Sequence, residues 1–494
     1  MVRQSLIFSA FILFVIHLEA KDYNVISYGA KPNGISSSTP YIQAAIDQAH
    51  QDGGGRVVFP KGRYVSGSIH LKSNVKLYLE NKATLLGSLN AEDYTKSGKW
   101  KALILAKGSS NIGIGGKGTI NGRGAQLALK IDSMFYAGMI DSADYNFVEK
   151  RPKYYLRPQI IYFFGCNTVD IRNITIENSA CWVQTYEQCK NLQINGVKVD
   201  SDAYWNNDGI DIVDSKNVLI SDCHINSSDD GICIKSEDFS LKHFCDSILI
   251  RNCSVRSSAS AVKFGTSSVN HIRNVTVQNI KVFNTYRSAI AIEAMQGGIL
   301  ENILVENIVA KNTGNAIFMR IGRIRNASKP GLLKNITLRN IKVTVPFENP
   351  DMEYKIRGPE LPFFHNIFPS SITGIPNQKI ENVTLENITI AYPGRGVQAY
   401  ASMPLHRVAD VPELVTKYPE FSMFGELPAW GFFVRHVDGL IMTNIKLKIK
   451  KADYRTSLVF DDVNRLTINN LSVKGDKKKR SYFLRRVTNF SLVE

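Results

Sequence analysis

A short pattern of alternating apolar and polar residues recurs along most of the chain after about residue 110. One copy reads NITIENS at 173–179, another reads NVTVQNIKV at 274–282, and a third reads NVTLENITI at 382–390. Each copy contains short strands with β-branched residues at alternate positions and with Asn, Asp, Ser or Gly between them. The copies recur about every 24 to 30 residues with almost no helical periodicity, which predicts a solenoid of stacked coils.

A single coil of this kind cannot bury its apolar face, so the coils must stack and align their Val, Ile and Leu residues as continuous ladders. The best-fitting fold class is all-β, as a parallel β-helix. The Asn residues of several N-x-S/T triplets are interpreted as turn and ladder residues rather than as glycosylation sites; they are Asn173, Asn252, Asn274, Asn335, Asn382 and Asn387.

Two kinds of segment depart from the repeat. Residues 1–20 have a basic start, an apolar run and a small residue at Ala20, which predicts a signal peptide and export to the periplasm or the extracellular space. Residues 21–100 are expected to form an N-terminal cap, with a short amphipathic helix, and the first coils. Residues 101–494 are expected to form the main β-helix, with long cleft loops at 343–378 and 391–430.

Charge and cysteine content narrow the class of partner. The chain has 60 Lys plus Arg against 44 Asp plus Glu, a net charge of +16, which favours a polyanionic partner. No basic helix with interleaved aromatic residues is found, so an acidic polysaccharide is preferred to nucleic acid, and no membrane partner is expected. The seven cysteines contain no C-x-x-C pair and are interpreted as buried thiols, with one bridge such as Cys181–Cys189 left open.

Aspartates interrupt strand-like runs between residues 205 and 236. Asp208 and Asp229 are 21 residues apart, close to one coil, so they are expected on adjacent coils roughly 5 Å apart. If Asp230 and Asp211 share that face, carboxylates converge beside Trp205, Lys235 and Lys263. Close like charges raise a pKa, as a general acid requires, and a carboxylate pair holding a water cleaves glycosidic bonds with inversion. A calcium site and a purely structural ladder of aspartates remain alternatives.

The motifs NNDGIDI at 206–212 and SSDDGICIKS at 227–236 resemble the signatures of glycoside hydrolase family 28, the polygalacturonase-like pectin hydrolases. The segments RPQIIYFFGCNTVDIRNITIENSACW at 157–182 and WGFFVRHVDGL at 430–440 are similar to bacterial members. The resemblance implies a right-handed parallel β-helix and an inverting hydrolase that needs no metal or cofactor. It also implies that Asp229 is the general acid and that Asp208 and Asp230 position and deprotonate the attacking water.

Two positions depart from the family pattern. Where Gly-His-Gly is expected, residues 258–261 read Ser-Ala-Ser-Ala, and where Arg-Ile-Lys is expected, residues 291–293 read Ala-Ile-Glu. The substrate-binding candidates are therefore the remaining polar residues around the motifs: Asn206, Asp211, Lys235, Lys263, Arg287 and Glu293. The expected acid and base residues are present, whereas the residues that would bind a uronic carboxylate differ from the family pattern.

These features predict a monomeric hydrolase of pectic polysaccharide. A mixed or decorated chain such as rhamnogalacturonan fits better than plain polygalacturonan, and the long loops at 343–378 and 391–430 favour exo action by closing one end of the groove. Two alternatives remain: a polysaccharide lyase on the same fold, with Lys263 or Arg287 as the base, and a carbohydrate-binding β-helix without activity.

Overall fold

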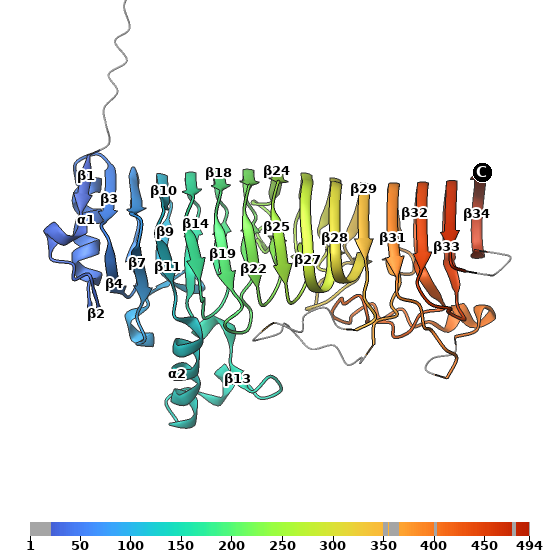
Figure 1. The fold of residues 1–494 in the computed structure, drawn as a ribbon, viewed down its shortest axis with the longest axis horizontal. Helices are drawn as coiled ribbons and strands as arrows, with labels where there is room; N and C mark the ends of the chain where they lie inside the picture. The colour runs from blue at the N-terminus through green and yellow to red at the C-terminus, as the bar shows by residue number, and fades with distance from the viewer. Residues whose placement is uncertain (1–20, 349–353, 355–364, 400–402, 477–480, 494) are drawn as a thin grey trace, which may run out of the picture.

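The chain folds as an elongated right-handed parallel β-helix in the computed structural model, which describes residues 21–348, 354, 365–399, 403–476 and 481–493 (Figure 1). Successive coils stack along one axis, with residue Asp22 near one end and Val493 near the other. The predicted fold class is therefore confirmed. The signal peptide predicted at 1–20 lies outside the described residues.

Three parallel sheets run along the axis. The first sheet contains β1 (Asp22–Asn24), β3 (Gly55–Phe59), β6 (Val75–Leu79), β10 (Ser110–Gly116), β15 (Asn167–Arg172), β18 (Lys190–Asn195), β21 (Lys216–Ser221) and β24 (Cys245–Arg251). The second contains β2 (Asn33–Ser37), β4 (Gly62–Ser66), β7 (Ala83–Gly87), β11 (Thr119–Asn121), β16 (Thr175–Glu177), β19 (Lys198–Ser201), β22 (His224–Ser227) and β25 (Ser254–Ser257). The third contains β5 (Ile69–His70), β9 (Trp100–Lys107), β14 (Gln159–Phe164), β17 (Gln184–Glu187), β20 (Ile210–Val213), β23 (Ile232–Ser236), β26 (Val262–Ser268) and β30 (Ser370–Thr373).

In the C-terminal half, continuous strands bend around the corners and contribute to two or three sheets each. They are β27 (Ile272–Ala294), β28 (Ile299–Ile321), β29 (Leu332–Thr344), β31 (Ile380–Tyr392), β32 (Ala429–Ile449), β33 (Thr456–Lys474) and β34 (Tyr482–Val493). Short elements decorate the coils: β8 (Lys96–Ser97), β12 (Tyr145–Asn146), β13 (Arg151–Pro152), η1 (Val25–Tyr28), η2 (Ala91–Asp93), η3 (Ser142–Asp144), η4 (Tyr154–Leu156) and η5 (Leu405–Asp410).

The core consists of inward ladders of aliphatic side chains. Ile194, Ile220, Ile250 and Val277 occupy equivalent positions on consecutive coils, and all four are fully buried. Side chains alternate between the two faces of each strand, so the residues between them point to solvent. A parallel β-helix therefore needs only the short alternating pattern seen in the sequence, repeated in register.

Helix α1 (Thr39–Gln51) covers the N-terminal end of this core. Its buried residues Ile42, Ala45, Ile46 and Ala49 follow helical spacing and lie on one face. Pro40 stands in its first turn, where a missing N–H costs no hydrogen bond. The short capping helix expected within residues 21–100 is confirmed.

Turn asparagines stack as predicted. The side-chain amide of Asn302 donates to Asn274, that of Asn335 donates to Asn302, and that of Asn382 donates to Asn335, with N–O distances of 3.1–3.2 Å. A parallel ladder contains Asn252 and Asn387, whereas Asn173 has the same left-handed backbone without joining a ladder. All seven cysteines are buried free thiols, so the bridge Cys181–Cys189 is not formed.

Two insertions project from the same side of the β-helix (Figure 1). One contains helix α2 (Gly124–Tyr136) and the antiparallel pair β12–β13, which the sequence analysis did not predict. The other follows β31 and contains η5. The segment 343–378 is not wholly a loop, because β30 lies inside it and restores the third sheet. None of the helices in the described part of the chain is long and apolar enough to span a membrane.

Candidate active site

Three aspartates meet at the corner between the second and third sheets. Asp229 and Asp230 lie between β22 and β23, and Asp208 lies just before β20 on the preceding coil. Since Ile210 pairs with Ile232, Asp208 aligns with Asp230 and not with Asp229, so the register expected from a 21-residue coil is off by one. A Cβ on Gly209 would lie 2.5 Å from the carbonyl oxygen of Gly231, so the glycines after these aspartates let the coils approach closely.

Two buried lysines neutralise part of this cluster. Lys235 on β23 places its Nζ 2.9 Å from Asp208 Oδ2 and 2.7 Å from Asp211 Oδ1. Lys263 on β26 places its Nζ 3.0 Å from Asp230 Oδ2. Asp229 accepts a hydrogen bond from the side-chain amide of Asn206 at 3.3 Å and has no lysine partner among the described residues. The cluster therefore leaves Asp229 as the carboxyl group without a direct cation.

This arrangement separates the pKa values of the neighbouring carboxyls. Burial raises the pKa of Asp229, and the negative charge of Asp230 raises it further. Burial also acts on Asp230, but the positive charges of Lys263 and Lys235 outweigh it and hold the pKa of Asp230 below its ordinary value. Burial raises the pKa of Asp208 well above its ordinary value against the opposing charge of Lys235. Asp229 is thus disposed to carry a proton beside an ionised Asp230.

The space between Asp208 and Asp230 suits a water molecule. One carboxylate oxygen of each residue and the Sγ of Cys233 lie within 4.8 Å of one another. A water there could reach both carboxylates at hydrogen-bonding distance. Calcium binds six to eight oxygen ligands, whereas here each carboxylate already has a lysine and burial raises the pKa of the Cys233 thiol well above its ordinary value. The donor set fits a water better than a cation.

Two adjoining cavities open beside the aspartates. The smaller, of about 180 Å³, is lined by residues that include Trp182, Thr266, Ser267 and both Asp208 and Asp230. The larger, of about 500 Å³, lies toward the α2–β13 insertion and is lined by residues that include Arg151, Lys153, Arg287 and Glu420. Five residues line both cavities: Tyr154, Asn206, Asp229, Arg325 and Tyr418. Asp229 therefore stands at the junction between the two spaces.

The structure brings most of the predicted site residues together, but not all at the surface. Asn206, Asp208, Asp229, Asp230, Lys235 and Lys263 line the smaller cavity, and Arg287 lines the larger one. Asp211 and Glu293 line neither cavity. Asp211 forms an ion pair with Lys235, and burial raises the pKa of Asp211 to about 6. Glu293 accepts a 2.6 Å hydrogen bond from Thr266, and burial raises its pKa to about 7.

The expectation that Trp205 lies beside the aspartate cluster was also wrong. Trp205 stacks under the guanidinium of Arg151, 4.2 Å from its ring centroid, and does not line the smaller cavity. Trp182, one coil earlier, takes that place, with Lys235 Nζ 3.8 Å from its ring centroid. The sequence could not distinguish the two, because both follow a turn of the same repeat.

Several lining residues were not predicted individually because they come from inserted segments, although Tyr418 and Glu420 fall within the cleft loop expected at 391–430. Tyr418 and Glu420 belong to the insertion before β32, and Arg325 follows β28. Tyr418 contacts Thr266 through its hydroxyl at 3.1 Å, and Glu420 forms an ion pair with Arg287. Arg325 donates a 3.1 Å hydrogen bond to Ser267 Oγ. The expected cleft loop at 391–430 was therefore the sequence signal for Tyr418 and Glu420, whereas Arg325 had none.

Comparison with known proteins agrees with the resemblance of the motifs. Residues 51–352 match the family described as glycosyl hydrolases family 28. The chain is 24% identical over 358 residues to a probable polygalacturonase of Vitis vinifera, covering 69% of this chain and 64% of that protein. It is 24% identical over 437 residues to an exo-poly-alpha-D-galacturonosidase of Dickeya chrysanthemi, covering 74% of this chain and 71% of that protein.

A solved structure extends this similarity to the fold. The family 28 exopolygalacturonase of Yersinia enterocolitica superposes with a TM-score of 0.66 at 18% identity, covering 96% of this chain and 78% of that chain. The family match spans more than half of the 494 residues and includes all three aspartates of the corner. The chain is a member of glycosyl hydrolases family 28.

Proposed function

We propose that this protein hydrolyses glycosidic bonds of an acidic pectic polysaccharide with inversion of configuration. The observation that carries the proposal is the pair of neighbours Asp229, whose pKa is raised, and Asp230, whose pKa is lowered. A general acid and an ionised base side by side are what the two halves of an inverting displacement require. Residues 1–20 fit export, so the protein acts outside the cytoplasm.

The two cavities assign the sugars on either side of the scissile bond. Asp229 protonates the leaving oxygen at the junction, while Asp208 and Asp230 hold the water and the ionised Asp230 takes its proton. Because the water-holding pair lines only the smaller cavity, the sugar whose anomeric carbon is attacked lies there, beside Trp182. The leaving part of the chain then occupies the larger cavity, beside Arg287 and Glu420.

The cations lining the cavities favour a chain of mixed sugars. Arg287 is tied to Glu420, so the pair presents hydroxyl-binding groups without net charge to the sugar beside it. Arg325 makes no ion pair with any described residue and reaches Ser267 in the smaller cavity, where it can bind a uronic carboxylate. Lys153 supplies a cation for a uronate elsewhere in the larger cavity. A uronate followed by a neutral sugar, as in a rhamnogalacturonan backbone, fits this pattern.

A lyase reaction fits the site less well. It needs a neutral lysine or arginine to remove a proton, and both candidates are bound to carboxylates. Burial lowers the pKa of Lys263, but the charges of Asp230 and Glu293 outweigh burial and raise it well above its ordinary value. The nearby carboxylates likewise raise the pKa of Arg287 despite its burial. Neither group can act as a base at neutral pH.

The proposal is tested by incubating the purified protein with polygalacturonan, rhamnogalacturonan and uncharged galactan and identifying the released sugars by chromatography. We expect the fastest release from rhamnogalacturonan, with the inverted anomer seen first by proton NMR. Unsaturated products absorbing in the ultraviolet would establish a lyase instead. A product with retained anomeric configuration would contradict the roles assigned to the three aspartates. Release of sugars from galactan alone would contradict the proposal that the substrate is acidic.

A further inference from the structure

The outer face of the second sheet carries a row of lysines that the active site does not use. Three outward positions of this sheet hold Lys281 on β27, Lys342 on β29 and Lys446 on β32, which lie in one row along the axis. A second row, two residues further along each strand, contains Lys311, Lys448 and Lys474. We refer to these six residues as the lysine stripe.

The lysine stripe follows the long axis of the solenoid. Its members lie on β27, β28, β29, β32 and β33, and neighbouring strands are about 5 Å apart, so the stripe extends over about 25 Å. All six side chains are exposed. The other positions of both rows in these coils are Phe283, Val309, Thr344, Thr389, Ala391 and Ser472, so neither row contains an acidic residue there.

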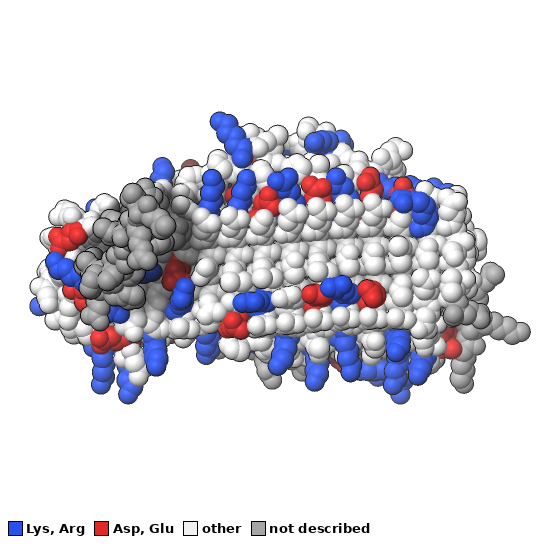
Figure 2. Space-filling model, turned by 90° about the horizontal axis from the view of Figure 1, so that it is seen from above, with Lys and Arg blue, Asp and Glu red and all other residues white. Residues whose placement is uncertain are grey.

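On the neighbouring first sheet, by contrast, basic side chains form ion pairs with acidic ones. There, Arg273 pairs with Asp246, Lys334 with Glu301, Arg339 with Glu306 and Arg465 with Asp438. The six stripe lysines make no ion pair with any residue that the structure describes. Figure 2 shows rows of interleaved red and blue side chains on the face turned to the viewer, and mainly blue side chains projecting along the lower edge.

We propose that the lysine stripe is a second binding surface for a polyuronate chain, separate from the catalytic cavities. This inference rests on the proposed function for the identity of the polyanion. A linear chain with a carboxylate on successive sugars matches a linear array of cations on a flat sheet, where exposed charges attract without a preformed pocket. None of the six lysines lines either cavity, so the stripe can hold the enzyme on the polymer while another segment occupies the active site.

The test uses the triple variant Lys342→Gln, Lys446→Gln, Lys448→Gln. The matched control, Lys61→Gln, Lys107→Gln, Lys117→Gln, removes the same charge from exposed lysines near the N-terminal end that also form no ion pair with a described residue. Both triples are made with and without Asp229→Asn, so that binding is measured without turnover. The probes are polygalacturonate, vesicles of phosphatidylserine and phosphatidylcholine, and duplex DNA. Each is tested at about 50 mM and about 500 mM salt, which shortens the Debye length from roughly 14 Å to roughly 4 Å.

We expect the stripe triple to bind polygalacturonate about tenfold more weakly at low salt, with a smaller salt dependence, because three exposed charge contacts are lost. The control triple should bind like the parent. With Asp229 intact, both triples should turn over a short oligosaccharide at the parental rate, since the stripe does not line the cavities.

Equal weakening in both triples would reduce the effect to net charge and overturn the inference, as would unchanged binding in the stripe triple. A loss confined to vesicles or DNA would assign the surface to another polyanion. The two proposals fail separately. If no pectic polymer is cleaved but the stripe triple still loses polygalacturonate binding, the hydrolase proposal alone fails; if cleavage occurs and stripe binding is absent, the stripe alone fails.

Discussion

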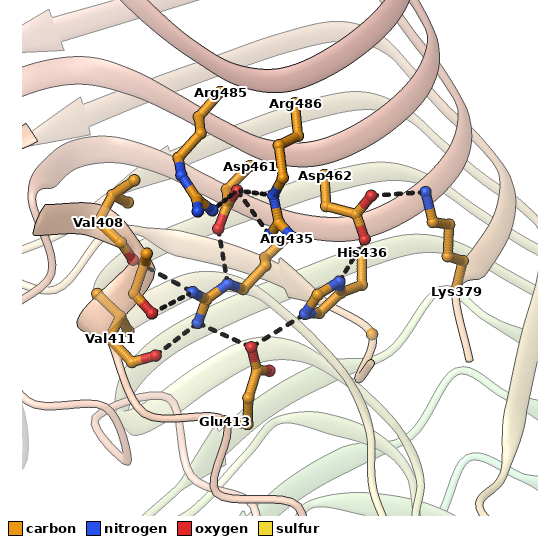
Figure 3. Close-up of polar contacts among 12 residues, drawn as sticks. Lys379, Val408, Val411, Glu413, Arg435, His436, Asp461, Asp462, Arg485 and Arg486 are labelled. Carbon is orange, nitrogen blue, oxygen red and sulfur yellow. Dashed lines mark hydrogen bonds and ion pairs between the residues drawn. The ribbon is translucent and has the colours of Figure 1, made fainter. Parts of the chain in front are cut away.

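Two buried charge clusters on the outer face of the third sheet differ in what surrounds them. The first contains Asp208, Asp211, Asp229 and Asp230 with Lys235 and Lys263, so carboxylates outnumber cations. The second lies toward the C-terminal end, around Asp461 (Figure 3). One outward row of the same sheet links them through Glu293, Arg320, Thr373, Arg435 and Asp461 on successive coils. The scaffold is therefore the same at both places.

In the C-terminal cluster, the buried carboxylate of Asp461 is paired with several arginines. Asp461 is fully buried and accepts from Arg435, Arg485 and Arg486 at 2.7–2.9 Å. Arg435 also donates to the carbonyl oxygen of Val411, and His436 lies between Asp462 and Glu413, which ties the insertion that carries Tyr418 to the coils. Figure 3 shows Arg435 and Asp461 at the centre of these contacts.

The contrast distinguishes the proposed catalytic cluster from a cluster that only stabilises the fold. Burial acts on Asp461, but hydrogen bonds from Arg485 and Arg486 and the charge of Arg435 outweigh it and lower its pKa. At the corner, by contrast, burial raises the pKa of Asp208, Asp211 and Asp229 next to an open cavity. An incompletely neutralised cluster beside a cavity indicates chemistry, whereas a fully paired one indicates attachment.

The largest expected effect is on turnover. Asp229→Asn should lower the rate on natural substrate by about 10²–10⁴-fold, because the leaving oxygen loses its proton donor, while binding and thermal stability stay close to wild type. Activity on an aryl glycoside, whose leaving group needs no proton, should be partly restored. The control is Asp214→Asn, another buried carboxyl, which directly follows β20 and lines neither cavity. Equal losses in both variants would contradict a specific role for Asp229.

At Asp461, a substitution is expected to reduce stability and leave turnover unchanged. Asp461→Ala leaves the buried Arg435 with only its longer, 3.3 Å ion pair to Glu413, removes the shared partner of Arg485 and Arg486, and should lower the free energy of unfolding by about 3–5 kcal/mol. Turnover measured well below the unfolding midpoint should remain near wild type. Calorimetry provides the midpoint, and Asp438→Ala, which breaks a partly exposed pair with Arg465, should cost at most about 1 kcal/mol. A loss of activity without a loss of stability would mean that the cluster is not structural.

A smaller effect, on substrate preference, is expected when the ion pair between Arg287 and Glu420 is broken. Glu420→Gln removes the partner that neutralises it, so cleavage of polygalacturonan should rise relative to rhamnogalacturonan by about tenfold, the order of one additional charged hydrogen bond. The measurement is the ratio of kcat/KM for the two polymers. Arg287→Gln with Glu420→Gln should return the ratio toward wild type. An unchanged ratio in the single variant would exclude this pair from substrate selection.

The smallest effect is a shift in pH dependence. Activity should fall as pH rises through the raised pKa of Asp229, which must be protonated, and as pH falls through the lowered pKa of Asp230, which must be ionised. Lys263 lowers both values, so Lys263→Gln should move both limbs upward by about one pH unit. Lys379→Gln, which removes a partner of Asp462 in the C-terminal cluster, should leave the profile unchanged.

The repeated strands and the aspartate motifs could be predicted because they depend on short-range spacing. Alternating residues determine the ladders, and neighbours in the motif determine the corner. The register could not be fixed, since one residue of coil length decides whether Asp208 aligns with Asp229 or Asp230. Helix α2 and the contacts of Tyr418 and Glu420 were missed because they depend on inserted segments folding back over the corner.

The corners of the coils differ in length while the ladders stay aligned. Gly209 aligns with Gly231 on the next coil, and Gly231 aligns with Ala261 on the one after, although residues 237–244 are inserted in between. Each coil resets the register through its own inward side chains, so an insertion at a corner does not propagate. Descendants of such a chain can therefore acquire, lengthen or exchange corner segments like the one carrying Tyr418 and Glu420, and so change the substrate that is bound without altering the corner that carries the aspartates.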